Sequence, residues 1–162
     1  MAISKSNIAF SLVLISLLTA TVAHNSVDEI LKAHNDERAH LGLKPLKWSL
    51  ILQAYASAYT LKRKFDCKLE HSEGPYGENL FWGSPYGYYN YTYAVNDWIS
   101  EKQYYDYDSD TCQPDQMCGH YTQVVWAKTE SVGCAQVKCL NGDQFMACSY
   151  APPGNIIGEK PY

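Results

Sequence analysis

The sequence predicts a single α+β domain in which helices pack on a small antiparallel sheet. Helical apolar periodicity dominates most of the chain, strand-like runs occupy its end, and six cysteines can cross-link the two parts. The 162 residues are 46% hydrophobic and 19% charged, which suits one globular domain. The formal charge of −4 offers no electrostatic attraction for phosphate, so nucleic acid is not an expected partner.

The first residues have the layout of a secretory signal peptide. Lys5 precedes the apolar stretch Ile8 to Leu18, and small residues follow up to Ala23. This stretch is too short to span a bilayer. We expect a signal peptide over residues 1–23, a single domain over residues 24–162, and an extracellular protein.

Four helices are expected before the final strands. The first starts at the capping box Ser26 to Glu29, and Gly42 ends it. The second should span residues 48–65, since alanines favour it and one stripe is shared by Ile51, Tyr55, Ala58 and Lys62. The third and fourth are expected over residues 93–103 and 119–128. Glycines and prolines leave room for one short strand, over residues 78–82.

The end of the chain has the pattern of a β-hairpin. Residues 132–140 and 143–150 are strand-like, and Asn141-Gly142 is a strong turn signal between them. A three-residue loop in which Gly142 supplies the positive φ would place Cys134 opposite Cys148. Cys139 then points to the other face of the sheet, because side chains alternate along a strand.

The remaining cysteines are assigned by proximity and elimination. Cys112 and Cys118 bracket a short loop, so we expect them to pair. Cys67, at the end of the second predicted helix, is left to reach Cys139. Three disulfides would cross-link the helices and the sheet. They would also leave no free thiol to act as a nucleophile.

Two of the five histidines, His71 and His120, lie in unusual local sequences. On spacing alone, a structural hydrogen-bonded histidine is the favoured interpretation. The chain contains none of the common metalloprotease, serine hydrolase, phosphate-loop or paired-cysteine zinc motifs.

Two longer segments resemble the signature motifs of the CAP superfamily, which comprises the cysteine-rich secretory, antigen 5 and pathogenesis-related class 1 proteins. They are GHYTQVVW at residues 119–126 and CSYAPPGN at residues 148–155, and further matches extend the resemblance over residues 24–162. The plant pathogenesis-related class 1 proteins are the most similar subgroup. The resemblance implies an α-β-α sandwich with a central antiparallel sheet, the same three disulfides, secretion into the apoplast and antimicrobial defence.

In the resembled family a central cavity is lined by two histidines and two glutamates. The matching residues here are His71, Glu78, Glu101 and His120. Two imidazoles with nearby carboxylates could bind zinc or another divalent metal, although no cofactor is expected to be required. No substrate-positioning motif accompanies them, so we interpret the tetrad as a binding and structural site without catalytic residues. A metal-dependent hydrolase or protease that uses this cavity is the alternative.

A second feature is the density of aromatic residues between Phe81 and Tyr107, which holds eight of the 14 tyrosines. Several members of the resembled family bind sterols through an aromatic loop, which corresponds here to Tyr104, Tyr105 and Tyr107. We therefore expect a monomer that binds a sterol or another lipid and meets a microbial membrane surface. The competing interpretation is that these rings simply pack over the third helix and the sheet.

Two further motifs concern modification and processing. Asn90-Tyr91-Thr92 is a glycosylation sequon, which predicts a glycan at Asn90. Residues 152–162 resemble a stress peptide that some plant relatives release, so a peptide precursor is a third functional hypothesis. Ser149 replaces the asparagine that usually precedes the tyrosine at this point, which argues against release.

Overall fold

The computed structural model describes residues 26–162, so the predicted signal peptide lies outside the described residues. The helices are an N-terminal helix over residues 26–40, α2 (Leu50–Arg63), α3 (Tyr91–Ser100), the 3₁₀ helix η1 (Glu101–Tyr104) and α4 (Gly119–Val124). The strands are β1 (Lys47–Trp48), β2 (Gly77–Gly83), β3 (Tyr105–Asp106), β4 (Thr111–Cys112), β5 (Ser131–Lys138) and β6 (Gln144–Ala151). Among these residues no helix combines the length and apolar character that a membrane span requires.

Four strands form the central sheet in the order β1-β5-β6-β2, and β3 pairs with β4 in a separate two-stranded ribbon. The β5–β6 and β2–β6 pairs are antiparallel as predicted, whereas β1 runs parallel to β5. The short strands β1, β3 and β4 were not predicted, because two residues are too few to produce a period. The hairpin prediction is confirmed, since Cys134 pairs with Cys148 and Gly142 has a φ of 93°.

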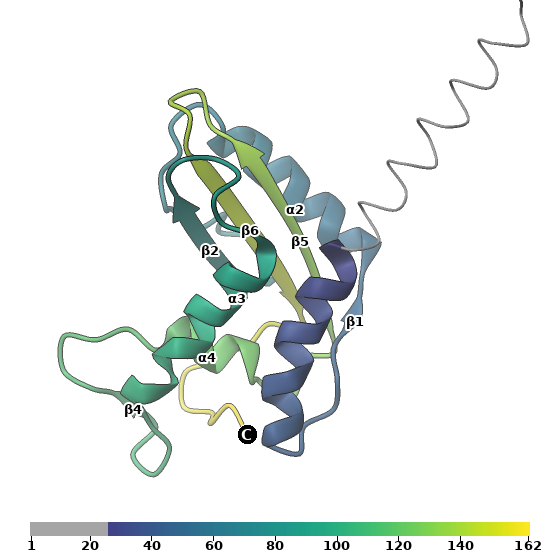
Figure 1. Cartoon of the computed structure of the whole chain (residues 1–162). Coiled ribbons are helices and arrows are strands. Elements are labelled where there is room, and N and C mark those ends of the chain that lie inside the picture. The colour runs from purple at the N-terminus through teal and green to yellow at the C-terminus, as the bar shows by residue number, and fades with distance from the viewer. Residues whose placement is uncertain (1–25) are drawn as a thin grey trace, which may run out of the picture.

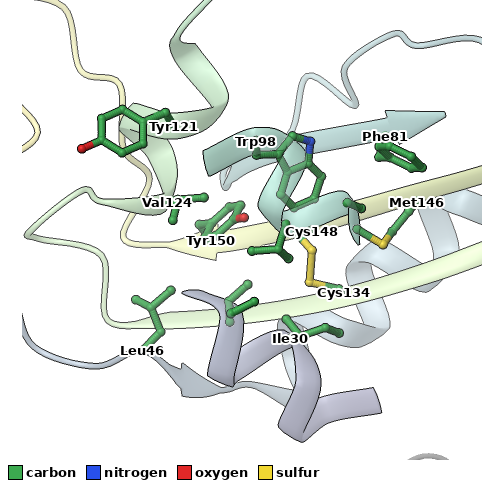
Figure 2. Close-up of a cluster of buried hydrophobic side chains, with 14 of the residues drawn as sticks. Ile30, Leu46, Phe81, Trp98, Tyr121, Val124, Cys134, Met146, Cys148 and Tyr150 are labelled. Carbon is green, nitrogen blue, oxygen red and sulfur yellow. A yellow bond between two sulfur atoms is a disulfide. The ribbon is translucent and has the colours of Figure 1, made fainter. Parts of the chain in front are cut away.

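Strand alternation separates two cores, one on each face of the sheet. Helices α2 and α3 lie on opposite faces (Figure 1). On one face Cys134, Met146 and Tyr150 meet the N-terminal helix, α3 and α4 (Figure 2). On the other face Phe145 and Ala147 meet α2. This arrangement confirms the predicted α-β-α sandwich.

The three disulfides follow the predicted pairing. They join Cys67 to Cys139, Cys112 to Cys118, and Cys134 to Cys148. Cys134–Cys148 belongs to the core under the N-terminal helix, whereas Cys67 and Cys139 belong to the α2 core. Each face of the sheet therefore carries its own cross-link.

Helix α2 is confirmed, but the stripe that predicted it is not its buried face. Ile51 is 73% exposed, and Ala58 and Lys62 are also exposed. The buried residues are Leu52, Ala56, Tyr59, Thr60 and Arg63. The first turn of α2 lies so close to β5 that a Cβ on Gly133 would collide with Gln53 N. Glycine at position 133 therefore sets the distance between α2 and the sheet.

The third and fourth helices differ from the predicted ranges. The predicted third helix divides into α3 and η1, whose 3₁₀ geometry begins at Glu101. The predicted fourth helix ends at Val124 instead of residue 128, since the buried Arg38 binds the carbonyls of Val124 and Trp126 at 3.0 and 2.9 Å. Arg38, from the N-terminal helix, thus donates hydrogen bonds to carbonyl groups that the end of α4 leaves without a helical partner.

Candidate functional site

The first histidine–glutamate pair joins the loop before β2 to β2 itself. His71 Nδ1 lies 2.9 Å from Glu78 Oε1, which also accepts a hydrogen bond from Ser72 N at 2.9 Å. Burial alone would raise the pKa of Glu78, but the bonds from His71 and Ser72 outweigh burial and hold this pKa below its ordinary value. The hydrogen bond to Glu78 in turn raises the pKa of His71.

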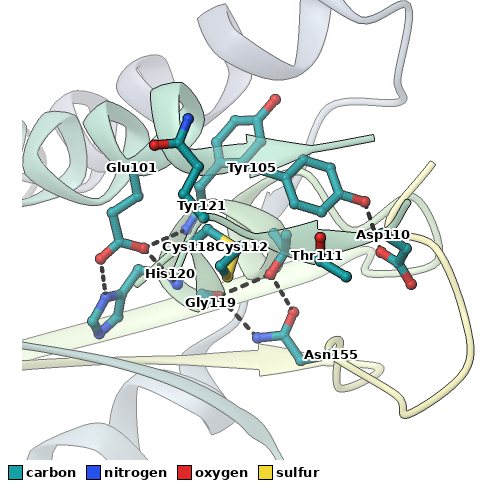
Figure 3. Close-up of a disulfide and its surroundings, with 12 residues drawn as sticks. Glu101, Tyr105, Asp110, Thr111, Cys112, Cys118, Gly119, His120, Tyr121 and Asn155 are labelled. Atoms are coloured by element: carbon teal, nitrogen blue, oxygen red, sulfur yellow. Dashed lines mark hydrogen bonds and ion pairs between the residues drawn. A yellow bond between two sulfur atoms is a disulfide. The ribbon is translucent and has the colours of Figure 1, made fainter. Parts of the chain in front are cut away.

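The second pair joins η1 to α4 (Figure 3). Glu101 Oε1 lies 2.7 Å from His120 Nδ1, while Oε2 accepts from the backbone N–H groups of His120 and Tyr121 at 2.9 and 3.3 Å. The N-cap residue of α4 supplies no side-chain cap, so the carboxylate of Glu101 caps this helix from another element. The ring of His120 also stacks on Trp98, with 6.1 Å between ring centroids.

One pocket of about 300 Å³ brings the two pairs together. His71, Glu78 and His120 line it, and Glu101 supports His120 from behind. Asn79 also lines the pocket and donates to His120 O at 3.0 Å, which ties β2 to α4. The four residues that the family resemblance selected therefore converge as two carboxylate–imidazole pairs.

The donor set of this pocket fits a divalent metal only in part. Each imidazole has Nδ1 committed to a carboxylate, which leaves Nε2 as its ligand atom. Glu78 Oε2 is buried and accepts no hydrogen bond from the described part of the chain. Within residues 26–162, however, no three His, Cys, Asp or Glu side chains already form a metal-holding group. A metal would therefore have to draw the two imidazoles together.

A buried polar network behind the pocket was not predicted. His34 is fully buried, with Nδ1 2.8 Å from Ile30 O and Nε2 2.9 Å from the hydroxyl of Tyr150. A carbonyl only accepts, so Nδ1 carries the proton and the hydroxyl donates to Nε2. Asn79 Nδ2 donates to the same hydroxyl at 3.4 Å. The motif His34-Asn35-Asp36-Glu37-Arg38 matched the family, but nothing in its spacing revealed this network.

The segment that contains Tyr104, Tyr105 and Tyr107, the tyrosines predicted to bind lipid, lies beside the C-terminal residues of the chain in space. Two of these tyrosines have defined partners. The hydroxyl of Tyr105 donates to Asp110 Oδ1 at 2.7 Å. Tyr107 stacks on Tyr162 with 4.9 Å between ring centroids, and Lys160 Nζ lies 4.4 Å from the centre of the Tyr107 ring. Tyr104 is half-buried. The upstream rings of Phe81, Tyr89 and Tyr93 pack against one another, as the competing interpretation expects.

Beside this segment lies a groove of about 330 Å³ that the sequence did not reveal. Its apolar lining includes Tyr105, Trp126, Ile156, Ile157 and Pro161. Polar groups from α4 and the C-terminal segment also line it, and the Cys112–Cys118 disulfide forms one side. Two adjacent isoleucines in a polar tail were the only available signal, and Ile157 is fully exposed.

The C-terminal segment is tied firmly to the domain. Gly154 N donates to Gln123 Oε1 at 3.0 Å, and Asn155 donates to Gly119 O at 2.8 Å. Ala127 N donates to Pro161 O at 2.6 Å. Release of a peptide from residue 152 onward would break all of these contacts, and it would also open the groove.

The predicted glycosylation site lies at the start of α3. Asn90 is exposed, and its Oδ1 caps the helix by accepting a hydrogen bond from Tyr93 N at 2.8 Å. A glycan would modify its Nδ2, whereas the cap uses Oδ1. The cap and a glycan are therefore compatible, and glycosylation stays a prediction.

Solved structures with the same architecture define the fold class. The chain superposes on Na-ASP-1 with a TM-score of 0.72 and 25% identity, over 85% of this chain but only 41% of that one. It also superposes on venom allergen-like protein 4 of Schistosoma mansoni with a TM-score of 0.65 and 26% identity, over 82% of this chain and 90% of that one.

Sequence comparison shows the family. The cysteine-rich secretory protein family, CAP, matches residues 31–150, and the chain therefore belongs to this family. Among its relatives, pathogenesis-related protein 1C of Nicotiana tabacum is 48% identical over 95% of this chain and 94% of its own length. Pathogenesis-related protein PR-1 of Medicago truncatula is 52% identical over 83% of this chain and 78% of its own length. These relatives support a plant defence protein, and three disulfides suit an extracellular one.

Proposed function

We propose that this protein acts in the plant apoplast as an antimicrobial defence protein that binds a sterol or a related lipid. The main support for this proposal is the groove of about 330 Å³ that Tyr105 and the C-terminal residues line. Ile156 and Ile157 supply its exposed apolar surface beside the buried Trp126, and hydroxyl, amide and carboxylate groups also line it. A sterol is a flat apolar body with one hydroxyl, so it suits a groove with this mixed lining.

Sterol binding is tested by titrating the purified protein with a fluorescent sterol. We expect saturable binding that Ile157→Asp weakens about tenfold or more, because the change places a charge on the apolar lip of the groove. Ile157 is fully exposed, so this variant should fold normally. Tyr88→Ala is the matched control, since Tyr88 is 74% exposed and does not line the groove. Absence of saturable binding, or equal binding by Ile157→Asp, would contradict the proposal.

Metal binding by the two imidazoles is a second candidate function. The buried oxygen Glu78 Oε2, which has no hydrogen-bond partner within residues 26–162, favours it, as does the fixed Nδ1 of both His71 and His120. Zinc titration followed by calorimetry should show one site that His71→Ala and His120→Ala each weaken about tenfold or more. His40→Ala, which removes an exposed imidazole elsewhere, should bind zinc normally. A hydrolase would additionally require zinc-dependent peptide or ester turnover that disappears in His71→Ala.

A further inference from the structure

Helix α2 and the turn after it carry an exposed apolar ridge. It consists of Ile51, Ala54, Ala58, Leu61 and Phe65, and we call it the α2 ridge. Ile51, Leu61 and Phe65 are 73%, 58% and 75% exposed. The spacing alternates between three and four residues, so Ile51, Ala54, Ala58 and Leu61 share one side of the helix, and Phe65 follows in the turn. An apolar line of this kind on a soluble domain indicates a contact surface.

The ridge is held rigidly in place. The opposite side of α2 is buried against β5 and β6, and the disulfide Cys67–Cys139 anchors the chain just beyond the helix. Arg63 binds Asp66 and Glu70, which fixes the following turn. A partner would therefore meet a preformed helix and would not have to order it.

The segment that contains the α2 ridge is positively charged although the whole protein is acidic. Residues 44–70 hold six Lys or Arg and only two acids, a net charge of +4 in a chain of net −4. Both acids bind Arg63. Among the described residues, Lys47, Lys62 and Lys64 have no carboxylate within ion-pair distance. The partner of this face should therefore be apolar and anionic.

A second copy of the chain does not meet this requirement. In a parallel pair of α2 helices, each lysine would lie beside the same lysine of the other copy. In an antiparallel pair centred on Ala58, Lys47 of one copy would approach Lys62 and Lys64 of the other. Both arrangements bring like charges together. The first turn of α2 contains no acid to oppose them. A helix from another protein is also disfavoured, because such helices usually dock into grooves, whereas these side chains project as a ridge.

We propose that the α2 ridge is the face with which this protein docks onto an anionic lipid bilayer. The apolar side chains would enter the boundary between headgroups and acyl chains, and the lysines would reach the lipid phosphates. This inference deepens the proposed function by naming the face that meets the lipid surface, and it rests on that function only in taking lipid as the partner.

Sedimentation with vesicles tests the inference. The purified protein is mixed with vesicles of phosphatidylcholine containing phosphatidylglycerol, and in parallel with vesicles of phosphatidylcholine alone. We expect binding to the anionic vesicles that falls as salt is raised. Phe65→Glu and Leu61→Glu should each reduce this partitioning about tenfold or more. Both residues are exposed, and mass spectrometry of the intact disulfides would confirm that the variants fold.

Tyr88→Glu is the matched control, because Tyr88 is 74% exposed, is aromatic like Phe65, and lies outside the α2 ridge. It should bind anionic vesicles as the unchanged protein does. Equal binding by the ridge variants would overturn the inference. Absence of vesicle binding would also overturn it. Light scattering that shows a dimer would then indicate a second copy of the chain as the partner of the ridge, and binding of an acidic amphipathic peptide would indicate another protein. Sterol titration without vesicles separates the two proposals, since Phe65→Glu should retain sterol binding and Ile157→Asp should lose it.

Discussion

Replacement of Arg38 by methionine should lower the free energy of unfolding by about 3–5 kcal/mol, because several buried carbonyls lose their donor at once. Arg38 is fully buried and donates to the carbonyls of Lys44, Val124, Trp126 and Thr129 at 2.9–3.1 Å. Burial lowers the pKa of Arg38 to about 10, so it remains charged at neutral pH. Urea unfolding monitored by tryptophan fluorescence gives the change.

Two further variants define the cause of this loss. Arg38→Lys keeps the charge but cannot reach all four carbonyls, so it should fall between the unchanged protein and Arg38→Met. Lys32→Met removes an exposed cation from the same helix, and it should change stability by no more than about 0.5 kcal/mol. A loss below about 1 kcal/mol in Arg38→Met would contradict the assigned role. Since Arg38 holds the end of α4, its loss should also loosen His120.

Acidification should destabilise the protein through His34. Burial, with a smaller contribution from Arg38, outweighs the hydrogen bond to Ile30 and lowers the pKa of His34 from 6.5 to about 4. The unfolded imidazole therefore takes up a proton below pH 6.5, whereas the folded one stays neutral until about pH 4. The unfolded state binds more protons throughout this window, so stability falls as the pH falls. The expected loss is about 3 kcal/mol.

The measurement is the free energy of unfolding from pH 7 to pH 4, compared between the unchanged protein and His34→Gln. Glutamine retains hydrogen-bonding groups but does not titrate, so the slope due to residue 34 should disappear. His40→Gln changes an exposed histidine of the same helix and should keep the slope. Identical pH dependence in the unchanged protein and His34→Gln would show that residue 34 does not cause it.

The disulfides and the hairpin could be derived from the sequence because they depend on local rules. The turn at Asn141-Gly142 set the register, and the register placed Cys134 opposite Cys148. Strand alternation then sent Cys139 to the other face, where it meets Cys67. The hairpin steps need only the period of a strand and the length of a turn, whereas Cys67 was assigned to Cys139 by elimination.

The buried face of α2 could not be derived in the same way. Ile51 and Ala58 form one stripe, whereas Leu52, Ala56 and Tyr59 form another, and both have helical spacing. Helical periodicity does not distinguish two apolar sides of one helix. The side that packs against the sheet is the one that also contains Thr60 and Arg63. Net charge was similarly uninformative, because the value for the whole chain concealed the positive segment around α2.

The candidate site came from resemblance and not from spacing. His71, Glu78, Glu101 and His120 lie on separate elements, so no local pattern could unite them. The groove was missed for a related reason. It forms where the C-terminal segment lies against α4 and the disulfide loop, and this long-range contact leaves no period in the sequence.

The position of Asn90 has a consequence for orientation. It begins α3, on the opposite side of the sheet from α2 (Figure 1). A sugar chain attached there would extend into solvent while the lysine-rich side rests on lipid. Antibodies or lectins directed at that carbohydrate should therefore still reach the protein after it has settled on a cell.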